Sequence, residues 1–430
     1  MSKTLLRHIQ VVDPGGPAHG TEVDLLVEDG RFIRIGQRLP KGTAREINLP
    51  GLHASPGWLD LQAHFRDPGE EYKQGILNGL DAAAVGGFTS VAVLPSTQPV
   101  IDTRSGIEHL LRKGAGHAVR VLPIGALTKG LQGHQLAELF DLEQAGAVAF
   151  SDDQHAIRNA RLLMLALQYS IPLKGVVMVF PQDADLAHSG QMHESPMSAR
   201  LGLRGIPALA EEVQLARDIA LLAYTGSRMH VSTVSTAEGV ALVRKAKLDG
   251  LAITAAVAAH HLLLDDGCLR GFDPLYKVLP PLRDPEHIEA LREGVKDGTI
   301  DSIVSDHRPE DVEHKKVEFA QAAFGAIGLE TSFAVANTAL KGRLSLRRLV
   351  ERFSHGPRKV LGLPVYHIAE GGPVDITLFD PEVQWTCTKE DLVSRSKNSP
   401  FIGQPLTGRP LGILRDAHRV LSPALKEQLA

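Results

Sequence analysis

From residue 56 onward, short apolar runs rich in β-branched residues alternate with longer segments of helical periodicity. This alternation is the strongest constraint on the fold. Continuous apolar strands separated by helices indicate a parallel sheet that is covered on both faces. We expect such strands at 89–94, 147–150, 174–180, 228–231, 253–257 and 300–305. The number of these units favours a closed (β/α)8 barrel of the TIM type over an open sheet.

Two segments with β character flank this alternating region. Residues 22–36 contain two apolar runs on either side of an Asp29-Gly30 turn, which is the pattern of a hairpin. A similar strand pattern returns at residues 374–387. We therefore expect a composite β-sandwich domain made from residues 1–53 and 366–430, and a barrel domain made from residues 54–365.

Composition limits the classes of partner and the compartment. The net charge of −4 over 430 residues gives no electrostatic reason to expect binding to nucleic acid or to an anionic membrane. The sequence has no apolar run of about 20 residues and no signal-peptide pattern, so no membrane span is expected. With only two cysteines, far apart in the sequence, a disulfide framework is not indicated and a cytoplasmic location is expected.

Polar residues follow the predicted strands, and these are the candidates for a functional site. In (β/α)8 barrels the chemistry is carried by the loops at the carboxyl ends of the strands. The segments in question are 60–64 (DLQAH), 151–153 (SDD), 180–183 (FPQD), 230–233 (HVST) and 305–307 (SDH). The sequence therefore predicts that side chains from these five segments meet at one mouth of the barrel.

The same segments resemble the dihydroorotase family of the amidohydrolase superfamily. Residues 56–100 resemble the family's opening motif, PG-(apolar)-D-x-H-x-H-x-R-x-PG followed by AAxxGGFT and PNTxP. Further counterparts follow in the same order at 191–207 (QMHESPMSARLGLRGIP), 230–239 (HVSTVSTAEG), 297–309 (DGTIDSIVSDHRP) and 396–403 (SKNSPFIG). The resemblance covers nearly the whole chain and implies the (β/α)8 fold and a metal-dependent hydrolase of cyclic amides.

The resemblance also implies a metal site, and this chain departs from it. The family holds two metal ions, usually zinc, which activate a hydroxide that attacks the cyclic amide carbonyl. The positions that keep a family-like ligand are His64, Asp153 (with Asp152 as the alternative) and Asp306, which in the family is also the general base. Three family histidines are replaced, by Gln62, Phe180 and Thr233. The family's T-D-H-A-P-H motif reads SDHRPE here, at residues 305–310.

Substrate-binding positions have changed in a similar way. Arg66 stands where the family's arginine meets the substrate carboxylate, a task that suits its bidentate fork. Ser96 replaces the asparagine of the PNT motif, and Leu279 replaces a second substrate-facing asparagine. The alternative for the retained residues is a purely structural role. His64 can be a buried histidine bonded to the backbone, and Arg66 can pair with Asp60 or Asp67.

The main hypothesis is a non-catalytic scaffold that binds no metal. The chain resembles the dihydroorotase-like proteins that have lost metal ligands, and some of these are implied to assemble with aspartate carbamoyltransferase in pyrimidine synthesis. Aspartate carbamoyltransferase is therefore the expected partner, and self-association into a homo-oligomer is expected as well. The alternative is an active cyclic amidohydrolase, acting on dihydroorotate, a hydantoin or allantoin, with zinc held by His64, Asp153 and Asp306. A third possibility is a small-molecule sensor that binds an acid through Arg66.

Overall fold

The structure is a computed structural model that describes residues 3–427. Eight parallel strands follow one another around the barrel in chain order. They are β6 (Trp58–Ala63), β7 (Phe88–Val93), β8 (Arg120–Gly125), β9 (Ala149–Ser151), β10 (Val176–Val179), β13 (Arg228–Ser232), β14 (Ala252–Ala258) and β15 (Ser302–Val304). The first and last strands meet where Ala63 forms a parallel bridge to His307. The predicted (β/α)8 barrel is confirmed.

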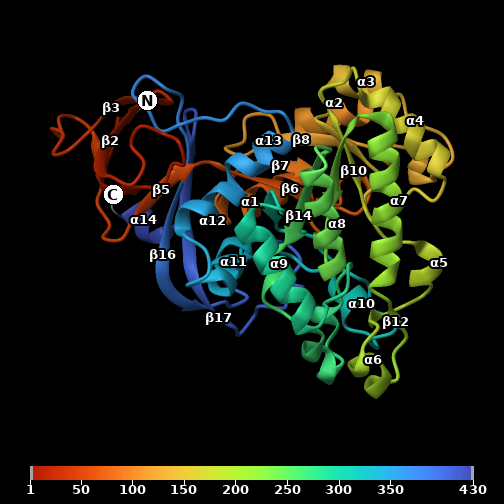
Figure 1. Ribbon diagram of the computed structural model, residues 1–430. Helices are drawn as coiled ribbons and strands as arrows, with labels where there is room; N and C mark the ends of the chain where they lie inside the picture. The colour runs from red at the N-terminus through yellow and green to blue at the C-terminus, as the bar shows by residue number, and fades with distance from the viewer. Residues whose placement is uncertain (1–2, 428–430) are drawn as a thin grey trace.

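Helices cover the outside of the barrel (Figure 1). Between strands run α1 (Ile76–Val85), α2 (Arg104–Lys113), α3 (Leu139–Ala145), α4 (Ala160–Ser170), α7 (Leu209–Thr225), α8 (Ala237–Leu248) and α9 (Pro285–Asp297); after β15 come α11 (Ser332–Leu340), α12 (Leu346–Phe353) and α13 (His355–Val360). None of the helices described in residues 3–427 is both long and apolar enough to cross a membrane.

Two barrel strands were missing from the six predicted apolar runs. The end of β6 was expected from the polar segment at residues 60–64, whereas β8 was not predicted. Its residues RVLPIG contain Pro123, and proline inside an apolar run argues against a central strand because it lacks a backbone N–H donor. The structure tolerates Pro123 opposite Val93 of β7. The six strands predicted around the barrel are all present, with ends that differ by up to two residues.

The two ends of the chain form one eight-stranded sheet beside the barrel, and Figure 1 shows the first strands (red) next to the last ones (blue). In sheet order the strands are β18 (His418–Leu421), β17 (Pro405–Arg415), β16 (Asp375–Thr386), β5 (His53–Pro56), β1 (Thr4–Val11), β2 (Glu22–Glu28) and β3 (Arg31–Gly36), with β4 (Arg45–Ile47) paired to β1. The pairing of β5 with both β1 and β16 joins the two termini. The helix α14 (Pro423–Glu427) ends the described chain.

An aromatic cluster connects this sheet to the barrel. The side chain of Trp58, in β6, is fully buried and stacks on Phe333 of α11 at a centroid distance of 4.6 Å. Phe379 of β16 lies 5.4 Å from the same indole ring. Burial of such large side chains stabilises the folded state by several kcal/mol each, so this contact fixes the barrel against the terminal sheet.

Short elements lie between the barrel strands and their covering helices on the carboxyl side. They are η1 (Lys129–Leu131), α5 (Ala184–Ala187), β11 (Met192–His193), α6 (Pro196–Leu201), β12 (Gly205–Ile206), η2 (Ala259–Leu262), η3 (Asp266–Gly271), η4 (Pro274–Tyr276) and α10 (Val312–Lys315). Lys277 binds this layer together, because its ammonium group donates to the backbone carbonyl of Phe319 at 2.7 Å and to the side chain of Gln191 at 2.5 Å.

Candidate functional site

The predicted site residues do meet at the carboxyl ends of the barrel strands. Gln62 lies near the end of β6 and His64 just beyond it, Asp153 follows β9, Phe180 follows β10, Thr233 follows β13 and Asp306 follows β15. All six side chains are buried. The convergence follows from the topology, since parallel strands of a barrel end at the same rim.

At the centre of this rim lies Arg308, a residue that the sequence analysis did not single out. Its Nε donates to Asp306 Oδ1 at 2.9 Å. Its Nη1 and Nη2 donate to the two carboxylate oxygens of Asp153 at 2.9 and 2.5 Å. The guanidinium is buried, at 4% exposure, so both ion pairs are removed from water. One cation therefore joins the two acidic residues expected to be metal ligands.

The charges of this group are mutually dependent. Burial alone would raise the pKa of Asp153, but the adjacent Arg308 guanidinium outweighs burial and holds that pKa well below its usual value. For Asp306, burial dominates over Arg308 and the pKa is raised. Burial would lower the pKa of Arg308, and the two carboxylates reverse that shift and raise it. Arg308 is therefore a permanent cation at this position.

Gln62 and His64 are fully engaged in hydrogen bonds. The Gln62 amide donates to Asp306 Oδ1 at 2.9 Å and accepts from the Ser232 hydroxyl at 2.5 Å. His64 Nδ1 accepts from the backbone N–H of Arg66 at 3.0 Å, so its Nε2 carries the proton and donates to the Ser96 carbonyl at 2.6 Å. Burial, and then the charge of Arg66, lowers the pKa of His64 well below its usual value. Neither nitrogen of this neutral ring has a lone pair to spare.

Three of the other changed positions, Phe180, Thr233 and Leu279, have an apolar side chain or one without a described hydrogen-bond partner. The ring of Phe180 is 4% exposed, and Thr233 is fully buried with no hydrogen-bond partner described for its Oγ1. Leu279 packs against a small apolar cluster that includes Ala187 and Ile206. The Ser96 hydroxyl donates to Asp153 Oδ2, the oxygen that also accepts from Arg308 Nη1. The aspartates 152 and 153 are distinguished here, because only Asp153 faces Arg308.

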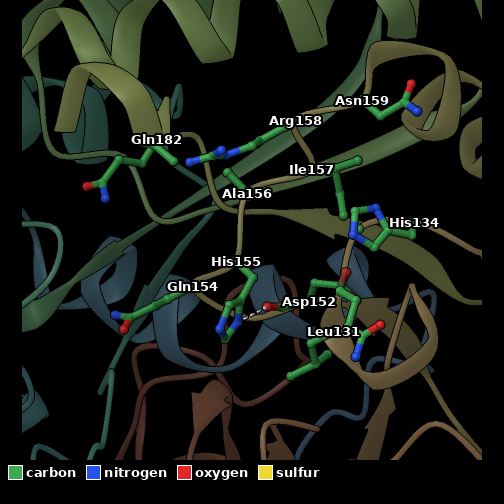
Figure 2. Close-up of a pocket in the computed structure, with 13 residues that line it drawn as sticks. Leu131, His134, Asp152, Gln154, His155, Ala156, Ile157, Arg158, Asn159 and Gln182 are labelled. Carbon is green, nitrogen blue, oxygen red and sulfur yellow. Dashed lines mark hydrogen bonds between the residues drawn. The ribbon is translucent and has the colours of Figure 1, made fainter. Parts of the chain in front are cut away.

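Asp152 instead faces a neighbouring cavity of about 640 Å³, shown in Figure 2. Its carboxylate accepts from the backbone N–H of Thr128 at 2.8 Å, and its backbone carbonyl bonds to the His155 ring at 3.0 Å. Arg158 and Gln182 line the far side of this cavity in Figure 2. A second cavity of about 480 Å³ lies over the rim itself, where Asp153 and Arg308 form part of its wall.

Arg66 is held by acidic side chains of the protein. Its Nη2 pairs with Glu310, its Nη1 lies 3.2 Å from Glu70 Oε2, and its Nε donates to the Pro309 carbonyl at 3.1 Å. Lys73 adds a second cation to Glu310 at 2.9 Å. The alternative pairing of Arg66 with Asp60 or Asp67 is therefore wrong, since Asp60 bonds to Ser305 and Asp67 to Lys113.

The role of Arg308 had a signal in the sequence. In the family motif T-D-H-A-P-H an alanine stands two residues after the aspartate, and here that position is an arginine. The final histidine of the motif is Glu310, which pairs with Arg66. Two differences from the family motif thus add charged groups to the rim. Arg308 pairs with Asp153 and Asp306, and Glu310 pairs with Arg66. Read together, they indicate that the polar groups of the site are paired with each other.

We predict that Arg308→Met lowers the free energy of unfolding by roughly 3–5 kcal/mol at pH 7, because it leaves Asp153 and Asp306 buried without a cation. Urea unfolding measures this change. The depressed pKa of Asp153 stabilises the wild-type protein above the unfolded pKa of about 3.9, and this contribution is lost as the pH falls. The difference between wild type and variant should therefore shrink below about pH 4.

The matched control for this variant is Arg158→Met. Arg158 lines the neighbouring cavity, its side chain is 66% exposed, and its ion pair with Asp185 is long at 3.5 Å. Its replacement should change the free energy of unfolding by less than about 0.5 kcal/mol. Equal stability of the two variants at pH 7 would show that the Arg308 ion pairs do not stabilise the fold.

Comparison with known proteins places the chain in a family. A family model described as Dihydro-orotase-like matches residues 53–239. The dihydroorotase of Pelotomaculum thermopropionicum is 43% identical over 411 residues, covering 95% of this chain and 96% of that protein. The dihydroorotase of Syntrophotalea carbinolica is 40% identical over 419 residues, covering 96% and 98%.

Solved structures superimpose on this chain over nearly its whole length, as the sequence relatives align with it. The L-hydantoinase (dihydropyrimidinase) from Arthrobacter aurescens superimposes with a TM-score of 0.85 at 26% identity, covering 98% of this chain and 96% of that one. A D-hydantoinase superimposes with a TM-score of 0.84 at 23% identity, with the same coverage, and supports the fold. With relatives that are 40% identical or more over almost its whole length, the chain belongs to the dihydroorotase family.

Proposed function

We propose that this dihydroorotase-family protein is a non-catalytic scaffold whose barrel mouth holds an internal ion pair in the place of the family's zinc ions. The observation that carries the proposal is the fork of Arg308 on Asp153 and Asp306. A cation supplied by the chain satisfies the two carboxylates, so the barrel keeps its closed and buried rim without a metal.

The residues at the rim do not fit the zinc site that the family implies. Zinc prefers neutral imidazole, carboxylate and thiolate ligands. Here both nitrogens of His64 are used by backbone groups, and the other ligand positions hold an amide, a phenyl ring and a buried hydroxyl. Placing zinc between Asp153 and Asp306 would bring a divalent cation against the Arg308 guanidinium. Two cations in contact in a buried site repel each other strongly.

The same groups do not form a substitute catalytic apparatus. In Asp306, the general base in the family, Oδ1 accepts from both the Gln62 amide and Arg308 Nε. Arg66, which would meet a substrate carboxylate, is bound to Glu310 and Glu70. Without a bound metal to lower the pKa of water from about 15.7 to about 7, the rim offers no comparable nucleophile at neutral pH.

The second candidate is a metal-dependent hydrolase of cyclic amides, and the names of the relatives favour it. The proteins that are 40% identical or more are named dihydroorotase, and the superimposed structures are hydantoinases. This candidate requires Arg308 to leave both carboxylates and His64 to give up a backbone bond, so that a reduced zinc site forms from His64, Asp153 and Asp306. The substrate would be dihydroorotate or a related cyclic amide.

Zinc counting with turnover assays separates the two candidates. We predict that Asp153→Asn leaves the zinc content of the purified protein unchanged, and that the wild-type protein neither hydrolyses dihydroorotate nor cyclises carbamoyl-aspartate. Thr233→His should not restore activity, because Gln62 and Phe180 remain and catalytic groups act as a unit. The matched control is Asp152→Asn, whose carboxylate faces Thr128.

Two results together would establish the second candidate. Zinc would be lost on Asp153→Asn and kept on Asp152→Asn, and the wild type would turn over at an ordinary enzymatic rate, on the order of 1–10³ s⁻¹. Elemental analysis after mild chelation and a coupled absorbance assay give these two numbers on the same preparation.

For the scaffold role, we predict a stoichiometric complex with aspartate carbamoyltransferase of the same organism, together with self-association of this chain. The retained barrel and terminal sheet offer broad rigid surfaces, and a stable contact needs roughly 1,200–2,000 Å² of total buried area. Co-expression followed by size-exclusion chromatography with mass measurement tests this. A transcarbamoylase that elutes alone, and that is fully stable and active without this chain, would exclude the scaffold role.

A further inference from the structure

A second cluster of potential ligands lies far from the barrel mouth, where the terminal sheet meets the barrel. Asp13 follows strand β1, His355 is the first residue of α13, and His367 lies in the segment between α13 and β16. One ligand atom from each residue lies within 4.8 Å of the other two. The cluster therefore draws on three separate parts of the chain, and its first and last members are 354 residues apart.

The distances within the cluster match those between ligands of one small cation. His367 Nδ1 donates a hydrogen bond to Asp13 Oδ1 at 2.9 Å, and His355 Nε2 lies 3.8 Å from the same oxygen. Ligands of a tetrahedral zinc ion at about 2.0–2.1 Å are about 3.3 Å apart, between these two values. The two imidazole rings stand edge to face at 85°, with their centroids 5.4 Å apart.

His355 is the member that points to a ligand. Its side chain is buried at 4% exposure, and its Nε2 has no hydrogen-bond partner among the described residues. Buried polar atoms without a hydrogen-bond partner are rare in folded proteins. Asp13 Oδ1 lies 3.8 Å from this nitrogen, a distance too long for a hydrogen bond. A cation between the two atoms would satisfy both.

The carboxylate of Asp13 is held in a fixed position by its surroundings. It is fully buried, and its Oδ2 accepts from the backbone N–H of Ile368 at 2.7 Å, which leaves Oδ1 for the two histidines. The turn after it closes tightly around the carboxylate, because a Cβ atom at Gly16 would lie 2.0 Å from Asp13 Oδ2. His367, by contrast, is 37% exposed, so the cluster is open to water on one side.

Another cluster of potential ligands consists of His193, Asp284 and His287, and its histidines are held by hydrogen-bond donors of the protein. His193 Nδ1 accepts from the Arg283 guanidinium at 3.0 Å, and His287 Nδ1 accepts from the backbone N–H of Ala237 at 2.9 Å. Neither the Arg283 guanidinium nor the Ala237 N–H can accept a hydrogen bond, so both histidine rings carry their proton on Nε2. In His193, Nε2 is the nitrogen that lies near Asp284. Nε2 therefore has no lone pair for a metal in this cluster. In His367, by contrast, the proton lies on the nitrogen that faces Asp13, and a cation bound between these two residues would displace it. The cluster of His193, Asp284 and His287 therefore serves as an internal control.

We propose that Asp13, His355 and His367 bind one divalent transition-metal ion of the zinc type, with water completing its coordination. Two imidazoles and a carboxylate are a common ligand set for such ions. The ion would fasten the terminal sheet to α13 of the barrel, and its role would be structural. This inference is independent of the function proposed for the barrel mouth.

Zinc itself is the probe that tests the site. Full-length protein is treated with chelator, dialysed and titrated with zinc, and the stoichiometry and dissociation constant are measured by calorimetry. We expect one zinc per chain, and a thermal unfolding midpoint that rises by on the order of 3 °C when zinc is about 100 times its dissociation constant. His367→Gln is the main variant. Because the His367 side chain is partly exposed, its replacement leaves the buried core unchanged.

We expect His367→Gln to weaken zinc binding by more than about 100-fold, since even outer partners of a metal site contribute 10–100-fold. His355→Gln should give the same loss. His287→Gln and Asp306→Asn should leave the dissociation constant within about twofold of wild type. The inference is overturned if the wild type binds no zinc, if zinc binding survives His367→Gln, or if it is lost in either control. Loss in Asp306→Asn would place the ion at the barrel mouth and would also contradict the proposed function.

Discussion

The pairing of Arg308 with Asp153 and Asp306 is the interaction on which the barrel mouth depends. Two carboxylates at the end of buried strands cannot remain ionised without a compensating cation. Arg308 supplies that charge from the motif that contains Asp306, and it reaches Asp153 across the rim. Gln62, Ser96 and Ser232 are oriented by this pair, directly or through one hydrogen bond. A change to the site must first break this network.

The same segment closes the barrel. Ser305 donates its hydroxyl and its backbone N–H to Asp60 of β6, at 2.6 and 2.8 Å. Burial raises the pKa of Asp60 to about 6, and these bonds from Ser305 oppose that rise. His307 then bridges Ala63. The contact between the first and last strands and the arginine fork thus lie within four consecutive residues, so barrel closure and the chemistry of the rim are linked through one loop.

The sequence was sufficient to predict the barrel and the meeting of the strand ends, because periodicity and chain order determine both. It failed for β8, where Pro123 masks a buried strand. The partners of Arg308 were also missed, although the residue lies in a recognised motif, because Asp153 is 155 residues away. Likewise, periodicity carries no signal that would bring Asp13 to His355. Hydrogen-bond roles such as those of His64 depend on backbone groups of neighbouring strands and require the folded structure.

We propose that a guanidinium group takes the place of the family's metal ions at the barrel mouth. Diffraction from crystals grown with zinc, with data collected on both sides of the zinc absorption edge, tests it most directly. We expect Arg308 to lie between Asp153 and Asp306, with no anomalous peak at that position. An anomalous zinc peak bridging the two carboxylates, with Arg308 turned away from both, would contradict it.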